Sequence, residues 1–212
     1  MKINSRKLIY IAATIFSFIF ITSCSNTKLT SVWMDKEKSG TSFNDILVIG
    51  ISDKELNRRL FEETFTTELN AAGVKSEVSY KILPQGSKIN RDTVSAAIKG
   101  KNIDAVIVTH LVTVDKETIY RENMDYRPSY GYYNGLYNYY PYVNGYVQQP
   151  GYYTTADVVT LETNLYEVKS EELVWSAHSR SFAPESAKEV IDDLVKLVIK
   201  DLEEKGLIKP KN

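Results

Sequence analysis

The chain has 212 residues, of which 26 are Lys or Arg and 27 are Asp or Glu, so its formal net charge is only −1. Proteins that bind nucleic acid gather basic residues on a face or stripe, and no such run occurs here, which argues against that class. The single cysteine excludes an intrachain disulfide and a zinc site built from thiolates.

The chain begins with the pattern of a targeting segment. Residues 2–7 carry three basic side chains, residues 8–22 carry no charge, and small residues then lead to Cys24. This apolar run is short for a transmembrane helix, which needs about 20 residues. Secretory cleavage alone would leave Cys24 as a reactive unpaired thiol on an exposed terminus.

These residues resemble the signal peptide of bacterial lipoproteins. The resemblance implies that residues 1–23 are removed, that the sulfur of Cys24 carries a diacylglyceryl group, and that the new amino terminus is acylated. Each buried CH₂ contributes about 0.8 kcal/mol, so two or three acyl chains form a stable anchor. The residues after Cys24 include neither an adjacent Asp nor an acidic cluster, so the resemblance favours the outer membrane and its periplasmic leaflet.

Two segments follow the leader in the predicted organisation. Residues 24–44 are mostly polar, and we expect a lipidated anchor and tether whose Trp33 docks on the folded part. Residues 45–208 are long enough to form one domain with its own core.

Eight elements are predicted in this domain. Continuous or alternating apolar residues predict the strands, and apolar residues at helical spacing predict the helices. In chain order we predict a strand at 45–51, a helix up to 72, a strand at 74–83, a helix at 91–99, strands at 104–120, 156–169 and 173–182, and a helix at 187–205. The order β-α-β-α-β-β-β-α predicts an α/β fold, a mixed-sheet sandwich covered by helices.

Local signals mark the helix ends. Ser52 with Glu55, and Ser186 with Glu189, have the spacing of a capping box, and Asn90 is a further candidate cap. The strand-to-helix turn at 50–53 is a place where backbone N–H groups can bind an anion. It lacks the glycine spacing and the lysine of nucleotide-binding loops, so we interpret it as an ordinary turn.

The domain is similar to known periplasmic domains in its element order and apolar text. The order resembles the domain shared by the curli secretion lipoprotein, the lipoprotein activators of penicillin-binding proteins, and the amino-terminal domain of the Tol translocation protein. The stretches ILVIGIS, RRLFEETFTTELNAAGVKSEVSY and DAVIVTHLVTV resemble uncharacterised bacterial lipoproteins. The likeness covers residues 31–205 and includes no chemical motif, so it implies a fold and not an activity.

Residues 126–153 differ from the rest of the chain in composition. From Pro128 to Ala156 there is no charged residue, and 12 of the 15 tyrosines lie between Tyr120 and Tyr153. Recurrent glycines and prolines predict a long loop between two late strands. Tyrosine combines apolar area, a hydroxyl and only two side-chain torsions, which suits recognition surfaces. The candidate binding residues are Tyr130, Tyr132, Tyr133, Tyr137, Tyr139, Tyr140, Tyr142, Tyr146, Tyr152 and Tyr153.

We therefore expect a non-enzymatic, outer-membrane-anchored lipoprotein that acts as a binding or assembly module through this Tyr-rich loop. Its expected partners are the membrane, through lipidated Cys24, and an envelope protein, a glycan or a second copy of the chain. We expect no nucleic acid, no cofactor, no metal and no catalytic residue. The alternative for the loop is a passive low-complexity insertion without a specific partner.

The alternative function is a small envelope hydrolase or a metal-dependent enzyme that uses His110 or His178, the two histidines of the chain. Both lie in predicted strands, and their spacing to the carboxylates matches no metal motif. No serine lies in the Gly-x-Ser-x-Gly elbow of hydrolases. Histidines in separate surroundings, without shared polar partners, would leave such an enzyme without its best candidates.

Overall fold

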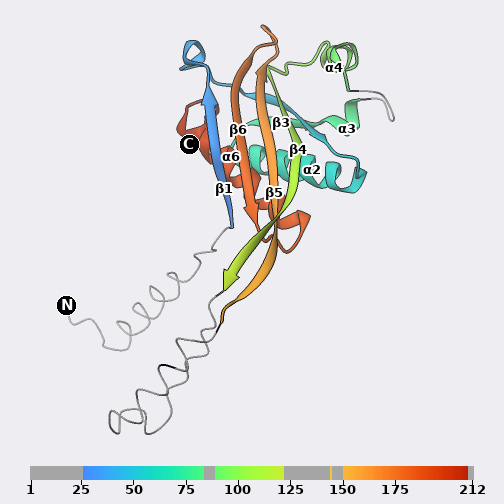
Figure 1. Cartoon of the computed structure of the whole chain (residues 1–212). Coiled ribbons are helices and arrows are strands. Elements are labelled where there is room, and N and C mark those ends of the chain that lie inside the picture. Colours follow the sequence, from blue (N-terminus) through green and yellow to red (C-terminus); the bar gives the residue numbers. More distant parts are fainter. Residues whose placement is uncertain (1–25, 84–88, 122–143, 145–149, 210–212) are drawn as a thin grey trace, which may run out of the picture.

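The computed structural model of the chain describes residues 26–83, 89–121, 144 and 150–209. Six strands form one mixed sheet in the order β1-β6-β5-β4-β2-β3, in which β2 is parallel to β3 and β4 and the other neighbours are antiparallel (Figure 1). The elements are β1 (Thr27–Met34), η1 (Lys36–Lys38), β2 (Asp45–Ile51), α2 (Glu55–Ala71), β3 (Lys75–Val78), α3 (Ser79–Ile82), α4 (Arg91–Ile98), β4 (Ala105–Arg121), β5 (Tyr152–Glu167), β6 (Leu173–Phe182) and α6 (Ala187–Glu204). The predicted α/β fold with a mixed sheet is confirmed.

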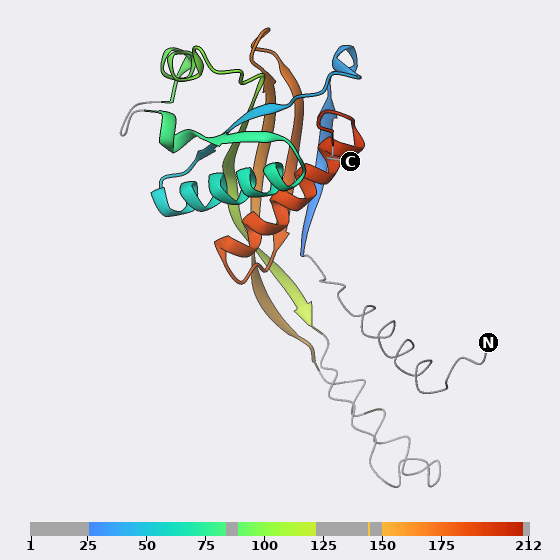
Figure 2. The same ribbon diagram turned by 180° about the vertical axis from the view of Figure 1, so that it is seen from behind.

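One face of the sheet is covered by α2 and α6, which lie side by side across it (Figure 2). Their apolar stripes meet the inward side chains of the strands in the main core. Trp175 of β6 is fully buried there, and its Nε1 donates to Oδ2 of Asp201 on α6 at 2.8 Å, which satisfies the indole N–H. Within the described ranges, no helix is long and apolar enough to cross a membrane.

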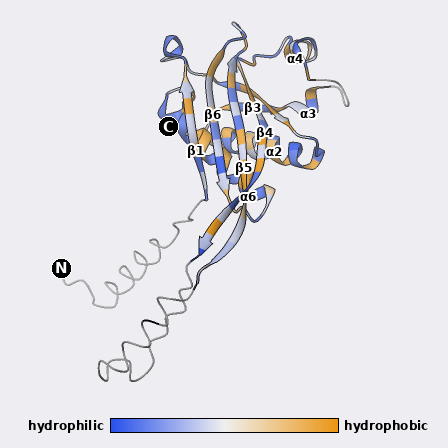
Figure 3. Cartoon of the chain, in the orientation of Figure 1, coloured by the Kyte–Doolittle hydropathy of each residue, from blue (hydrophilic) through white to orange (hydrophobic). Residues whose placement is uncertain are grey.

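The opposite face is covered in part. Near β2 and β4, a second apolar cluster contains Leu47, Ile49 and Val106, and Val94 and Ile98 of α4 pack against it. Over β1, β6 and β5, alternate side chains are partly exposed to solvent, and hydrophobic and hydrophilic residues alternate along these strands (Figure 3). We call this surface of β1, β6, β5 and β4 the open face.

The amino-terminal strand was not predicted. Residues 27–34, which we expected to lie in a tether, form the edge strand β1 and pair antiparallel with β6. Trp33 is therefore part of the sheet and not a separate docking point of a tether: it is the register partner of Ser176 and is 50% exposed on the open face. The Ser and Thr residues of this edge strand conceal the alternation by which strands are recognised, and a register shift between Leu29 and Ser31 interrupts it further.

The predicted strand at 74–83 divides into two elements. β3 ends at Val78, and residues 79–82 form the short helix α3. The change occurs where the buried carboxylate of Glu62 accepts hydrogen bonds from Ser79 Oγ at 2.6 Å and from Tyr80 N at 3.0 Å. These bonds to α2 draw the chain away from the sheet, so the strand does not continue.

The helix caps differ in how well the sequence predicted them. Asn90 forms a capping box with Thr93, and the Ser186 side chain accepts from Glu189 N at 3.1 Å, which confirms these two helix starts. The predicted box at Ser52 is wrong: α2 begins at Glu55 after Lys54, whose side chain provides no cap. Ser52 Oγ accepts instead from Lys54 N at 3.1 Å within the turn.

Candidate functional site

The most prominent feature of the molecule is a two-stranded extension of the sheet. β4 and β5 run on together past the end of β6, which terminates at Phe182 opposite Val158. Beyond that row, residues 116–121 pair with residues 152–157, from Lys116 with Asp157 to Arg121 with Tyr152. At the first of these pairs, Ala183 N, just after β6, still donates to the carbonyl oxygen of Asp157 at 2.8 Å. We call these two segments the arm; it projects from one end of the sheet (Figure 1).

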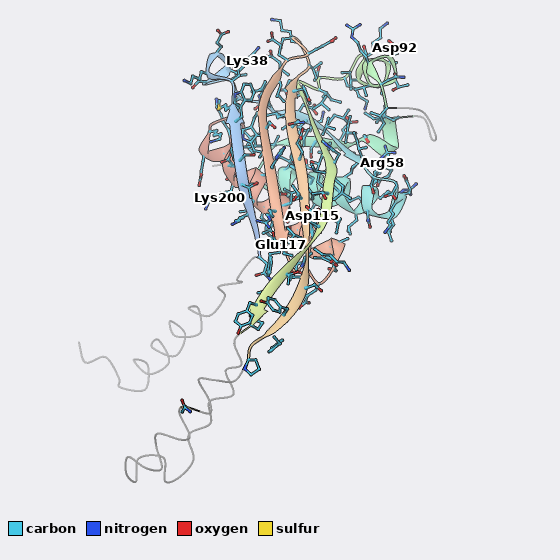
Figure 4. All side chains as sticks on the ribbon, in the orientation of Figure 1. Lys38, Arg58, Asp92, Asp115, Glu117 and Lys200 are labelled. Atoms are coloured by element: carbon cyan, nitrogen blue, oxygen red, sulfur yellow. The ribbon has the colours of Figure 1, made fainter. Side chains whose placement is uncertain are left out.

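The arm has no share in the core, since none of its residues is buried. A two-stranded ribbon is marginally stable on its own, so its order depends on continuity with the sheet. An ion pair at its base adds to this continuity, because the carboxylate of Glu117 meets the guanidinium of Arg180 on β6. Figure 4 shows Glu117 and the nearby Asp115 where the arm leaves the body.

The character of the side chains changes along the arm. Its base carries Lys116 opposite Asp157, and Glu117 on the other face of the ribbon. Its middle rows carry threonines, namely Thr118, Thr154 and Thr155. Its end carries the exposed rings of Tyr120, Tyr152 and Tyr153, which are 51%, 57% and 73% exposed. The base of the arm is therefore charged, whereas its end combines exposed aromatic rings with the single cation Arg121.

The aromatic end of the arm has a defined arrangement. The rings of Tyr120 and Tyr153, which are cross-strand partners, lie with their centroids 5.2 Å apart and their planes at 60°. The hydroxyl of Tyr120 accepts from Gly151 N at 3.0 Å. A Cβ at Gly151 would lie 2.3 Å from Cζ of Tyr120, so the close approach of this backbone to the ring requires glycine.

The candidate binding tyrosines divide between the arm and the segment that follows it. Tyr152 and Tyr153 are the first residues of β5 and lie at the end of the arm. Tyr130, Tyr132, Tyr133, Tyr137, Tyr139, Tyr140, Tyr142 and Tyr146 lie outside the described residues, as does Cys24. We expected a loop from residue 126 to 153, whereas β5 already begins at Tyr152. Neither the composition nor the apolar pattern indicates that both flanking strands leave the body together.

The two histidines occupy one row of the open face together with Glu162. His110 of β4 is the register partner of Glu162 of β5, which in turn is the partner of His178 of β6. His178 Nε2 lies 3.0 Å from Oε2 of Glu162, and Oε1 accepts from Asn164 Nδ2 at 2.7 Å. The bond from Asn164, and then that from His178, holds the pKa of the Glu162 carboxyl below its usual value, against an opposing effect of partial burial. Glu162 therefore lies between the two histidines in the row and is bonded to His178.

This row is open to solvent. The side chains of His178 and Glu162 are 44% and 28% exposed. Ser31 of β1 is the register partner of His178, but among the described residues no hydrogen bond joins the two side chains. In the same part of the chain, no group of three His, Cys, Asp or Glu side chains is placed to hold a metal ion. Among the residues that the structure describes, this row thus supplies His178 and Glu162 as an acid–base pair, and no side-chain hydroxyl is bonded to the imidazole.

The turn after β2 is occupied by a side chain of the protein itself. Gly50 N donates to Oε1 of Glu62 at 3.0 Å, and the same oxygen accepts from Arg58 Nε at 3.0 Å and from Ser79 Oγ. Glu62 is fully buried, so the bound anion at this turn is its own carboxylate. This agrees with the interpretation of residues 50–53 as an ordinary turn.

No protein-family model matches the sequence, and no curated protein is similar to it. Among solved structures, the chain is similar to the PelC dodecamer from Paraburkholderia phytofirmans, at 14% identity and a TM-score of 0.42, over 87% of this chain and 98% of that one. It is also similar to a lipoprotein from Neisseria meningitidis, at 13% identity and a TM-score of 0.41, over 76% and 99% of the two chains. At these values the likenesses carry no argument about function, which is argued from the chain's own residues.

Proposed function

We propose that this chain is a non-enzymatic lipoprotein of the outer membrane, anchored through Cys24 and facing the periplasm, which acts as a binding or assembly module. Its contact surface is the end of the arm together with the Tyr-rich segment that joins the two arm strands. The partner classes that suit this surface are an envelope protein, a glycan and a second copy of the chain.

The observation that carries the proposal is the arm itself. A passive loop can leave a sheet at the row where its neighbouring strands end, whereas here β4 and β5 continue for six further pairs without any other strand beside them. Their end exposes Tyr120, Tyr152 and Tyr153, which supply apolar ring area and hydroxyl groups at low cost in side-chain entropy. The uncharged composition from Pro128 to Ala156 continues this surface in the sequence.

A hairpin-closing variant tests the proposal. Arg121 and Tyr152 are register partners, so an Asn-Gly turn in place of residues 122–151 can join the two strands directly. The core residues that the structure describes all remain, and we expect the variant to unfold at the same temperature as the intact protein. Self-association is measured as molar mass by light scattering, and binding is measured by cosedimentation with peptidoglycan or by retention of envelope proteins. Whichever of these the intact protein shows should be lost in the variant.

The matched control is His178→Ala, which removes a partner of Glu162 on the open face and leaves the arm unchanged. The proposal predicts normal association or binding for this control. Equal behaviour of the intact and hairpin-closed proteins would show that the Tyr-rich segment is a passive insertion. Loss of binding in the His178→Ala control instead would move the site to the open face.

A further inference from the structure

We propose that the aromatic end of the arm contacts the headgroup layer of the membrane that holds Cys24, so that the chain is attached to this membrane at two places. The inference rests on the proposed lipidation of Cys24. The partner of the described end of the arm is then a phospholipid surface, a class that the proposed function does not name.

The first step concerns the direction of β1. β1 is antiparallel to β6, and β6 is antiparallel to β5, so β1 and β5 run in the same direction. β5 runs from the end of the arm towards the body, and β1 therefore begins at the arm end of the sheet. Figure 1 shows the start of β1 and the arm at the same end of the molecule. The chain between Thr27 and Cys24 leaves the domain there.

The second step compares two lengths from a common row of the sheet. Thr27 is the partner of Ser181, which is the partner of Val159, which in turn pairs with Val114. From Val114 to Arg121 the strand advances by seven residues, about 23 Å at 3.3 Å per residue. From Thr27 back to Cys24 there are three residue steps, which span at most about 11 Å when fully extended.

From this common row, the strand up to the end of the arm is thus about twice as long as the chain from Thr27 to Cys24 when that chain is fully extended. The acyl chains on Cys24 must lie in the hydrocarbon, which holds the Cys24 backbone at the membrane surface. With the strands nearly perpendicular to that surface, the last rows of the arm reach the headgroups before the chain from Thr27 to Cys24 is fully extended. This orientation brings the end of the arm into contact with lipid.

The third step is the chemistry of the arm. Charged residues at its base suit water, and the exposed tyrosines at its end suit the headgroup layer, where Tyr and Trp collect because one part of the ring is apolar and the other polar. The charged side chain in its last rows is Arg121, a cation that can donate to lipid phosphates. The part of the arm that reaches furthest towards the membrane thus carries the tyrosines and the cation that suit a lipid surface.

Site-specific labelling of the full lipidated chain tests the inference. Acylation of Cys24 blocks the sole native thiol, so one introduced cysteine takes an environment-sensitive fluorophore without competition. Thr155→Cys places the label on the exposed arm, and Lys36→Cys places it on the exposed η1 at the other end of β1. Each protein is reconstituted into vesicles of phosphatidylethanolamine and phosphatidylglycerol that contain a headgroup nitroxide quencher.

We expect the quencher to reduce fluorescence at Thr155→Cys by about twofold or more and to leave Lys36→Cys nearly unchanged. Adding Tyr152→Glu and Tyr153→Glu to Thr155→Cys should reverse most of that quenching, because carboxylates are repelled by anionic lipid and are costly to desolvate. Flotation of the same samples measures the anchor separately. Protein that floats without quenching at Thr155→Cys overturns the inference and leaves the lipid anchor standing. Protein that does not float contradicts the anchor, and the inference fails with it.

Discussion

The fully buried side chain of Glu62 holds three parts of the domain together. Its carboxylate accepts hydrogen bonds from Gly50 N at the end of β2, from Arg58 on its own helix, and from Ser79 and Tyr80 at the start of α3. A buried carboxylate is tolerated only when its oxygens are satisfied in this way. Arg58, labelled in Figure 4, therefore stabilises a buried carboxylate, although it lies on a helix surface.

Glu62→Gln should lower the free energy of unfolding by about 3 kcal/mol, because the amide NH₂ would face donors and the guanidinium of Arg58 would lose its buried carboxylate. Urea denaturation at neutral pH measures this loss. Glu68→Gln, an exposed change on the same helix, is the matched control and should stay within about 0.5 kcal/mol of the parent. Equal effects of the two substitutions would contradict the assigned role.

The open-face row makes a pH-dependent contribution to stability. The pKa of Glu162 is lowered in the folded state, first by Asn164 and then by His178, so folding favours its charged form. This contribution is present above the ordinary Glu pKa near 4.5 and is lost as the pH falls through the lowered folded value. Glu162→Gln should therefore cost up to about 1 kcal/mol at pH 7 and progressively less below pH 4.5. Urea denaturation of the parent and the variant, at pH 7 and below pH 4.5, measures this difference in the free energy of unfolding. A difference that does not change with pH would refute the account.

At the scale of the element, the arm depends on a glycine at its end. Gly151→Ala would place a Cβ 2.3 Å from the Tyr120 ring and 2.5 Å from the carbonyl oxygen of Arg121. We expect faster amide hydrogen exchange at the last arm pair and an unchanged unfolding temperature, because no arm residue belongs to the core. Thr154→Ala, a change two rows closer to the body, should leave exchange close to that of the parent. Unaltered protection in Gly151→Ala would show that the Tyr120 contact does not order the arm.

The elements that the sequence predicted well are those whose apolar pattern is decided by the core. The structure has four elements close to their predicted bounds: β2 with its continuous apolar run, α2 and α6 with their apolar stripes, and β6 with its alternation. β1 was missed because an edge strand needs few apolar residues. The end of β3 was missed because it depends on hydrogen bonds from Ser79 and Tyr80 to a residue 17 or 18 positions away.

At the scale of the whole molecule, the candidate site was predicted by composition and not by position. The Tyr-rich composition of residues 126–153 identified Tyr152 and Tyr153 as candidates, and both are exposed at the end of the arm. Composition does not reveal that β4 and β5 outrun their neighbours, since that depends on where β6 ends at Phe182. The meeting of His110 and His178 at Glu162 likewise depends on strand order and register, which neither histidine's local sequence encodes.

The central claim is that the arm makes the contacts and the body is their scaffold. The most direct measurement is photo-crosslinking in intact cells, with a photoreactive phenylalanine analogue in place of Tyr153 at the end of the arm or in place of Ser176 on the open face. The account predicts specific adducts, with lipid, glycan, another envelope protein or a second copy of the chain, from position 153 and none above background from position 176. Adducts from position 176 alone would contradict it and place the functional surface on the open face.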